Sequence, residues 1–231
     1  MAVAPRVQQS GHAIMPLCVY NACYLTLLAP EDYMQHLHPI SADEMVAVFL
    51  KTELASSRFS QTILSLLNRD GQTRQIVEQP DLTNLADTVY RRQLLGEWRG
   101  YQRNADVFTG FPAAVRWYRA LATRDDLAAI RYLNDDYWTV LSGGSRRVVD
   151  AVERIRQGIE AFQVRNDGFW FMADALCAGA VFPELILVGT DEQAPLVVLE
   201  GHVRLTAYVL RLECTPVTVP VLVGYAPDME K

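Results

Sequence analysis

The sequence predicts an α+β protein in which a mainly helical N-terminal region, residues 1–165, packs on a small α/β unit, residues 166–231. Apolar residues recur at three-to-four spacing through most of the first part, which is typical of amphipathic helices. After residue 181, dense apolar runs bounded by Gly and Pro indicate buried strands. Half of the 231 residues are apolar and 21% are charged, so the composition is that of a folded protein.

Several segments of the N-terminal region carry a helical pattern. Ser41 and Glu44 form a capping-box pattern before the first of them, and Asp81 or Thr83 is the expected cap of the third. Pro112 suits the first turn of the fourth. The expected helices cover residues 42–54, 58–70, 83–95, 111–122, 124–142 and 146–158.

The four cysteines are too few and too scattered for a disulfide scaffold, so reduced thiols are expected. They are Cys18, Cys23, Cys177 and Cys214. The first two lie in an apolar run without zinc-finger spacing, and core positions explain them, so no structural metal is expected. Residues 18–40 are expected to form a short buried strand or helix that leads into a loop, with His36 and His38 in the loop.

The C-terminal unit has the expected order helix, strand, strand, helix, strand. Pro183 and Gly189 bound the first strand, and Asp191 to Pro195 supply a turn before the second. The expected elements are a helix over 169–180, strands over 182–189 and 196–201, a helix over 202–213 and a strand over 217–225.

Charge is unevenly distributed along the chain. The net charge of −6 disfavours general binding to nucleic-acid phosphates. Residues 91–165, however, hold 13 Arg, no Lys and 9 Asp or Glu, which gives this stretch a charge of +4. Guanidinium groups suit phosphate and carboxylate contacts, but solvated or ion-paired helix faces explain the same composition. Nucleic acid is a partner that the sequence permits and does not favour.

No run reaches the roughly 18 apolar residues of a membrane span, and the N-terminus lacks the pattern of a signal peptide. We therefore expect a cytoplasmic protein without a membrane partner. The sequence carries no signal for an oligomeric state.

The stretch Glu200-Gly201-His202-Val203-Arg204 places charged residues between two apolar runs. If a strand ends at Glu200 and a helix begins at about His202, the free N–H groups of the first helical turn form an anion site. Gly201, Val203 and Arg204 would then hold phosphate, and Glu200 or His202 would act as a base or orient a metal.

A structural interpretation of the same residues stays open. Glu200, His202 and Arg204 can cap the helix and pair with one another. The stretch "DGQTR", residues 70–74, has the same carboxylate-Gly-x-x-Arg spacing but follows a helical pattern, so the spacing alone is a weak signal. The preceding strand and the following helix distinguish the two stretches.

With these residues in view, the C-terminal part, about residues 168–224, resembles the ParB/sulfiredoxin-like superfamily. "ALCAGAVFPELILVG" is similar to the helix, turn and strand of its ParB-like nuclease domains. "VVLEGHVRLTAYVL" is similar to the following strand and box, where Gly201, Arg204 and Ala207 match and Glu200 gives the acidic form. The first 165 residues resemble no family.

The resemblance implies binding of a nucleotide or another phosphorylated small molecule. ATP, ADP or CTP with Mg²⁺ are the implied ligands, and phosphotransferase, phosphohydrolase or nuclease chemistry is the implied activity, with Glu200 and His202 as catalytic residues. Sulfiredoxins carry a cysteine where this chain has His202, so that activity is not expected. The alternative is a non-enzymatic module that keeps the fold and binds a protein or nucleic acid.

A Gly-rich turn, "LSGGSRR" at residues 141–147, is a second candidate phosphate cradle. Main-chain N–H groups and two arginines would meet there, but the turn is too short for a P-loop. The start of a capped helix is the preferred interpretation.

Overall fold

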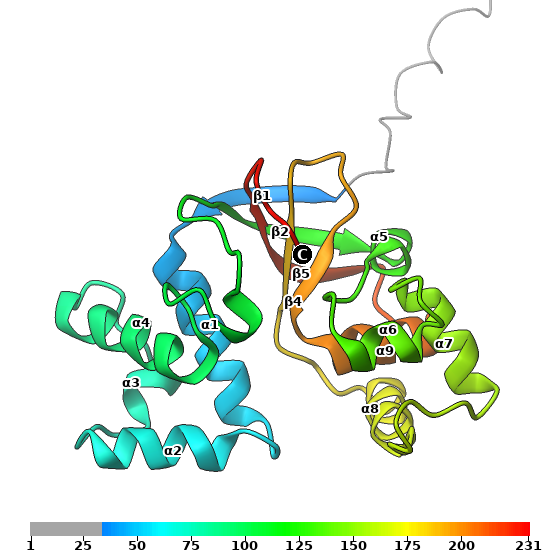
Figure 1. The fold of residues 1–231 in the computed structure, drawn as a ribbon, viewed down its shortest axis with the longest axis horizontal. Coiled ribbons are helices and arrows are strands. Elements are labelled where there is room, and N and C mark those ends of the chain that lie inside the picture. Colours follow the sequence, from blue (N-terminus) through cyan, green and yellow to red (C-terminus); the bar gives the residue numbers. More distant parts are fainter. Residues whose placement is uncertain (1–33) are drawn as a thin grey trace, which may run out of the picture. The chain divides into compact units, whose positions relative to one another are not determined.

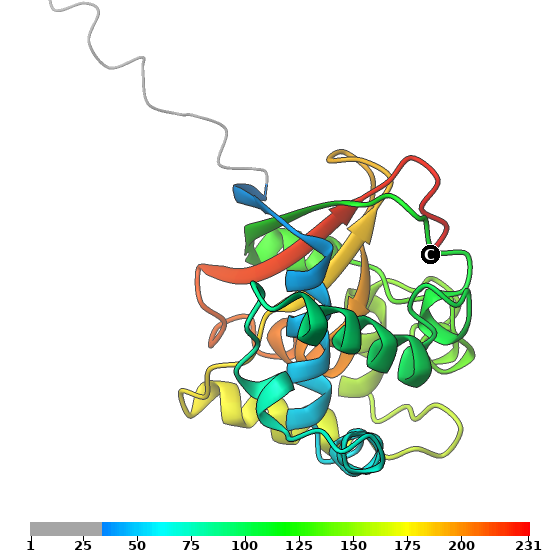
Figure 2. The same cartoon turned by 90° about the vertical axis from the view of Figure 1, so that its left-hand side faces the viewer.

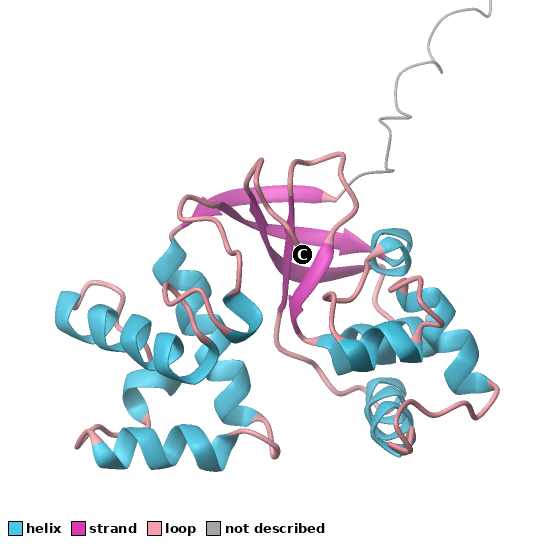
Figure 3. Cartoon of the chain, in the orientation of Figure 1, coloured by secondary structure: helices cyan, strands magenta, loops and turns pink. Residues whose placement is uncertain are grey.

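The computed structural model describes residues 34–231, which form a mixed sheet with helices on both faces (Figures 1 and 3). The strands are β1 (Gln35–Ile40), β2 (Arg116–Thr123), β3 (Leu185–Gly189), β4 (Val197–Glu200) and β5 (Thr218–Tyr225). The α-helices are α1 (Ala42–Ala55), α2 (Ser60–Arg69), α3 (Gln75–Glu78), α4 (Leu85–Arg99), α5 (Arg124–Ala129), α6 (Asp136–Leu141), α7 (Val148–Arg156), α8 (Asp167–Cys177) and α9 (His202–Leu210), with a 3-10 turn at Asp106–Phe108. The expected α+β class is confirmed.

The strand order in the sheet is β1-β2-β5-β3-β4. β3 and β5 are parallel, and the other neighbouring pairs are antiparallel. The expected order of helix, strand, strand, helix and strand in the C-terminal part is confirmed as α8, β3, β4, α9 and β5. All five residues of β3 are buried, since this strand is covered on both faces, and a continuous apolar run is typical of such a strand.

Each face of the sheet has its own hydrophobic core. Leu185, Leu187 and Val221 point to the core under α5 to α9. Ile186 and Leu222, the alternate residues on the same strands, point to the core under α1 to α4. Figure 2 shows α1 and α4 crossing in front of the sheet. The two helical layers therefore meet opposite sides of one sheet.

The predictions of two helices in the N-terminal region are wrong. Residues 116–123 of the segment expected as a helix over 111–122 form β2, which pairs with β5 along its whole length. Its Ala and Arg residues favour helix, but the tertiary pairing overrides that local preference. The helix expected over 124–142 is split into α5 and α6, because the main chain at Arg131 pairs with Val197 of β4.

Strand pairing crosses the division expected at residue 165. β2, from the first part, is the neighbour of β5, from the second, so both parts build one sheet. The described residues accordingly belong to a single compact unit. β2 and β5 are far apart in sequence, but they pair within the sheet, so no structural boundary lies between the two parts of the chain.

The helix starts test the expected caps. Ser41 accepts a hydrogen bond from the N–H of Glu44 at 3.1 Å, which confirms the first cap. Asn84 caps α4, in place of the expected Asp81 or Thr83. α4 also continues past residue 96 and ends at Gly100, whose φ of 81° suits glycine.

Residues before 34 lie outside the described part, including Cys18, Cys23 and most of the segment expected over 18–40. Its last residues form β1, so His36 and His38 lie in a strand and not in a loop. β1 is at the edge of the sheet, where a proline such as Pro39 is tolerated.

Cys177 and Cys214 form a disulfide, which corrects the expectation of reduced thiols for this pair. It joins the end of α8 to the segment after α9, across 37 residues of sequence. Spacing gave no signal for this bond, because the fold brings the two residues together.

No helix in the described part of the chain is long and apolar enough to cross a membrane.

Candidate functional site

The turn between β4 and α9 places Gly201 where a side chain would not fit. Gly201 has a φ of 101°, in the region that favours glycine. A Cβ atom there would lie 2.6 Å from Cδ2 of Leu185 and 2.9 Å from Nη2 of Arg204. The expected strand-glycine-helix arrangement is present and brings Glu200, Gly201, His202 and Arg204 together, while Val203 is 37% exposed.

Arg204 and Glu200 form an internal ion pair. Nη2 of Arg204 donates to Oε2 of Glu200 at 3.1 Å. Nη1 donates to the carbonyl oxygens of Pro183, at 2.8 Å, and Glu184, at 3.1 Å. Arg204 is only 7% exposed. Its donors are thus used within the protein, which is the geometry of the capping and pairing alternative and not that of a guanidinium open to phosphate.

His202 lies against aromatic rings. Its imidazole stacks on Trp138 with ring centroids 4.9 Å apart and lies nearly parallel to Tyr132 at 6.1 Å. Nε2 is buried and has no hydrogen-bond partner in the described part of the chain. Burial, reinforced by the positive charges of Arg204 and Arg99, lowers the pKa of His202 to about 3. A neutral imidazole with this pKa is a weak base at neutral pH.

Stability is expected to depend on pH through His202. The unfolded imidazole has a pKa near 6.5 and the folded one a pKa of about 3, so the unfolded chain takes up the proton first on acidification. The free energy of unfolding should be unaffected by His202 above pH 6.5 and should fall below it, by at most about 1.4 kcal/mol per pH unit. Urea unfolding of the wild type and of His202→Phe at several pH values measures this dependence. An equal change of the free energy of unfolding with pH in the two proteins would contradict it.

A second buried pair lies near the turn, on the other helical layer. Glu53 of α1 is 4% exposed and accepts hydrogen bonds from Arg99 at 2.7 Å and from Nε1 of Trp98 at 3.0 Å. Burial raises the pKa of Glu53, Arg99 opposes the rise, and the nearby charge of Glu200 adds to it. Each carboxylate has its own arginine, so these pairs leave no surplus positive charge to attract a phosphate.

The residues around Glu200 do not fit the Mg²⁺ ion that the resemblance implies. Mg²⁺ is usually held by carboxylates, waters and substrate phosphates. Glu200 and Glu53 both pair with arginines instead. Within residues 34–231, no three His, Cys, Asp or Glu side chains gather in a group that could hold a metal ion. The side chains around Glu200 therefore do not support a catalytic step that uses a bound Mg²⁺ ion.

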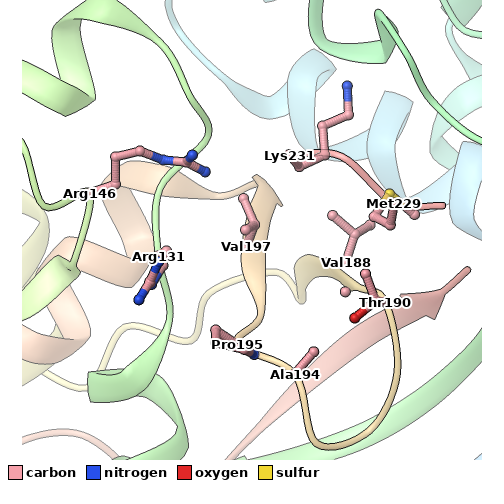
Figure 4. A pocket seen from close by; sticks show the side chains of 10 residues that line it. Arg131, Arg146, Val188, Thr190, Ala194, Pro195, Val197, Met229 and Lys231 are labelled. Atoms are coloured by element: carbon pink, nitrogen blue, oxygen red, sulfur yellow. The ribbon is translucent and has the colours of Figure 1, made fainter. Parts of the chain in front are cut away.

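A cationic pocket lies near the start of β4, away from Glu200 (Figure 4). It is a cavity of about 220 Å³ beside the carboxyl ends of the parallel strands β3 and β5. Such strand ends are where α/β sheets commonly bind ligands. Its lining contains no Asp, Glu, His or Cys and consists of Arg131, Arg146, Val188, Gly189, Thr190, Ala194, Pro195, Val197, Met229 and Lys231.

Main-chain hydrogen bonds fix Arg131 beside β4. Its N–H donates to the carbonyl oxygen of Leu196 at 2.9 Å, and its own carbonyl oxygen accepts from the N–H of Val198 at 2.9 Å. At the break between α5 and α6, Arg131 is therefore extended and pairs with β4 instead of continuing a helix. This extension brings the Arg131 side chain to the cationic pocket.

Arg146 is held by a constrained turn. Its φ is 61°, which is uncommon for a residue with a side chain and is often found at functional sites. The N–H of Arg146 donates to Oγ of Ser142 at 2.8 Å. Nε and Nη2 of its guanidinium donate to the carbonyl oxygen of Tyr132 at 3.0 and 2.9 Å. One edge of the guanidinium is thus anchored.

The cations of the pocket have no acidic partner. Among residues 34–231, Arg131, Arg146 and Lys231 form no ion pair. Burial lowers the pKa of Arg146, and the charge of Arg131 lowers it further. Lys231, across Val197 in Figure 4, donates to the carbonyl oxygens of Val107 and Thr109. Guanidinium groups without an acidic side chain nearby are suited to contacts with an anion.

Arg131 is not among the site residues expected from the sequence, and Arg146 is expected only as part of the second candidate phosphate cradle. The only signal near them is the Gly-rich turn at 141–147, for which the start of a capped helix is the preferred interpretation. In the structure, α7 begins at Val148, its N-cap residue Arg147 makes no side-chain cap hydrogen bond, and Gly143 and Gly144 have φ of 66° and 96°. The turn serves to present Arg146, and nothing in its letters shows that β4 lies beside it.

Most arginines of the stretch 91–165 have partners inside the protein. Arg91 is buried and donates to the carbonyl oxygens of Ile76 and Asp81. Arg92 pairs with Asp43. The ion-paired interpretation of this stretch describes these residues, so they do not form an open basic surface for nucleic acid.

No family model, curated protein or solved structure matches this chain. A functional assignment therefore rests on the geometry of its own residues.

Proposed function

We propose that this chain binds a phosphate-bearing ligand, a nucleotide or another phosphorylated small molecule, in the cationic pocket. The observation that carries the proposal is the pair of guanidinium groups, Arg131 and Arg146, at a cavity whose lining has no acidic side chain. Arg131 is exposed and Arg146 is half-buried, so water screens part of the repulsion between their charges, and a bound anion would relieve the remainder. The position of the cavity beside the carboxyl ends of β3 and β5 supports the same assignment.

The ParB/sulfiredoxin-like assignment of the C-terminal part belongs to this proposal. The order of α8, β3, β4, α9 and β5 and the left-handed Gly201 support it. We propose the phosphate site in the cationic pocket and not at the turn of Gly201, because Arg204 is paired with Glu200. The proposal is limited to binding, because Glu200 and His202 do not line the pocket that would hold the phosphate.

Phosphate binding is expected to depend on the two arginines. A charge-assisted hydrogen bond contributes about 1.5–3 kcal/mol, so Arg131→Gln and Arg146→Gln should each weaken binding by roughly tenfold or more. Calorimetric titration with orthophosphate, ATP, ADP, CTP and GTP, with and without Mg²⁺, measures the affinity of the wild type and of each variant.

Arg147→Gln is the matched control, since Arg147 is the exposed neighbour of Arg146 and does not line the pocket. It should bind like the wild type. Thermal unfolding of each variant checks that the fold is retained. Absence of binding to every phosphate compound, or undiminished binding by the Arg131→Gln, Arg146→Gln double variant, would refute the proposed function.

A further inference from the structure

The size of the cationic pocket restricts its ligand. Its volume of about 220 Å³ is below the roughly 300–1,000 Å³ of pockets that enclose drug-sized ligands. The loop between β3 and β4 bounds it through Thr190, Ala194 and Pro195. The pocket is partly open to solvent, but a base, a ribose and a triphosphate would not be enclosed in this volume together. The cavity matches a phosphate group with a short organic remainder.

The charge of the pocket suits a single phosphate. A phosphomonoester carries about 1.5 to 2 negative charges at neutral pH, and Arg131 and Arg146 supply two positive charges, while the ammonium group of Lys231 is engaged by the carbonyl oxygens of Val107 and Thr109. The Arg131 side chain makes no hydrogen bond within the described residues, so its planar fork can bind two phosphate oxygens. A triphosphate would bring more negative charge than the two guanidinium groups neutralise.

The lining of the pocket offers no carboxylate side chain for a divalent cation. Mg²⁺ is commonly held by carboxylates as well as by substrate phosphates, and no Asp or Glu side chain lines the pocket. A Mg²⁺ ion on the phosphate would stand beside two guanidinium groups and be repelled by them. A cation on the ligand would thus oppose binding here.

The remaining wall of the pocket is apolar. Val188 is fully buried, and Val197 and Met229 are each 7% exposed. These side chains belong to the core under α1 to α4. Of the three, Val197 and Met229 expose a small apolar surface to the pocket, so the part of the ligand beside the phosphate should be short and uncharged.

The geometry points to a small phosphomonoester, bound without a divalent cation, as the ligand class of the cationic pocket. This inference rests on the proposed function and narrows it, because it excludes nucleoside triphosphate–Mg²⁺ complexes from the pocket. Arg131 and Arg146 hold the phosphate oxygens, and the small exposed parts of Val197 and Met229 contact the organic remainder.

Calorimetric titration of the full chain with methyl phosphate, glycerol 3-phosphate, AMP and ATP tests the inference, each with and without Mg²⁺. The small phosphomonoesters should bind at least roughly tenfold more tightly than ATP, and Mg²⁺ should not strengthen their binding. Tightest binding by ATP with Mg²⁺ would overturn this inference and leave the proposed function standing. No binding by any phosphate compound would overturn both.

Two comparisons identify the contacts. Methyl sulfate has the shape of methyl phosphate and one negative charge, so it should bind more weakly if two guanidinium groups act together. Arg131→Lys keeps the charge and loses the planar fork, and it should weaken methyl phosphate binding by roughly tenfold, whereas Arg147→Lys should not. Equal affinity for methyl sulfate and methyl phosphate, or an unchanged affinity in Arg131→Lys, would overturn the inference.

Discussion

Arg204→Met is expected to lower the free energy of unfolding by about 3–5 kcal/mol, the usual cost of removing one partner from a buried ion pair. The substitution leaves the carboxylate of Glu200 without its arginine in a site where the side chains of Arg204 and Glu200 are only 8% and 15% exposed. It also removes the donor that satisfies the carbonyl oxygens of Pro183 and Glu184. Urea unfolding followed by circular dichroism measures the loss.

Two controls separate burial from charge in this experiment. Arg211→Met breaks an exposed pair with Asp174 and should cost at most about 1 kcal/mol. Adding Glu200→Gln to Arg204→Met should recover part of the stability, because the remaining buried charge is removed. A loss for Arg204→Met as small as that for Arg211→Met would show that the Glu200 pair is not structural. Phosphate binding by the folded Arg204→Met protein should match that of the wild type.

Cys177→Ser is expected to lower the free energy of unfolding by about 2–4 kcal/mol, since the disulfide restricts the unfolded chain across 37 residues. The bond joins the end of α8 to the segment after α9. The helices α8 and α9 pack on each other. Denaturant unfolding of the oxidised wild type, the reduced wild type and the variant measures the effect.

The reductant provides the internal control. It should destabilise the wild type to about the level of Cys177→Ser and should leave Cys177→Ser and Cys214→Ser unchanged. A background with Cys18→Ser and Cys23→Ser prevents thiol exchange with the N-terminal cysteines. Equal stability of the oxidised wild type and Cys177→Ser would contradict a stabilising disulfide.

Local patterns were sufficient for the C-terminal elements. Pro183 and Gly189 bound an apolar run that becomes β3, and Gly201 separates β4 from α9. Such segments are predictable because both faces of the strand are buried and because the turn requires a positive φ that favours glycine. The same reasoning places α1 after Ser41, whose cap is a contact between near neighbours in sequence.

Elements that depend on distant partners were not predictable in this way. Residues 116–123 have helical spacing at Trp117 and Ala120 but form β2, since β5 offers a full register of hydrogen bonds. Arg131 interrupts a helical pattern for the same kind of reason, because its main chain pairs with Leu196 and Val198. In both cases long-range pairing outweighs a local propensity.

The candidate site divides along the same line. The letters from Glu200 to Arg204 are enough to place charged residues at a strand-glycine-helix turn, because that geometry is local. Whether Arg204 faces a ligand or Glu200 was decided by packing, which buries the pair against Pro183 and Glu184. Arg131 and Arg146, 15 residues apart in sequence, lie at one cavity because the main chain at Arg131 pairs with Arg147 on one side and with Val197 of β4 on the other. Their charges act on each other through space, and that distance is a property of the tertiary structure alone.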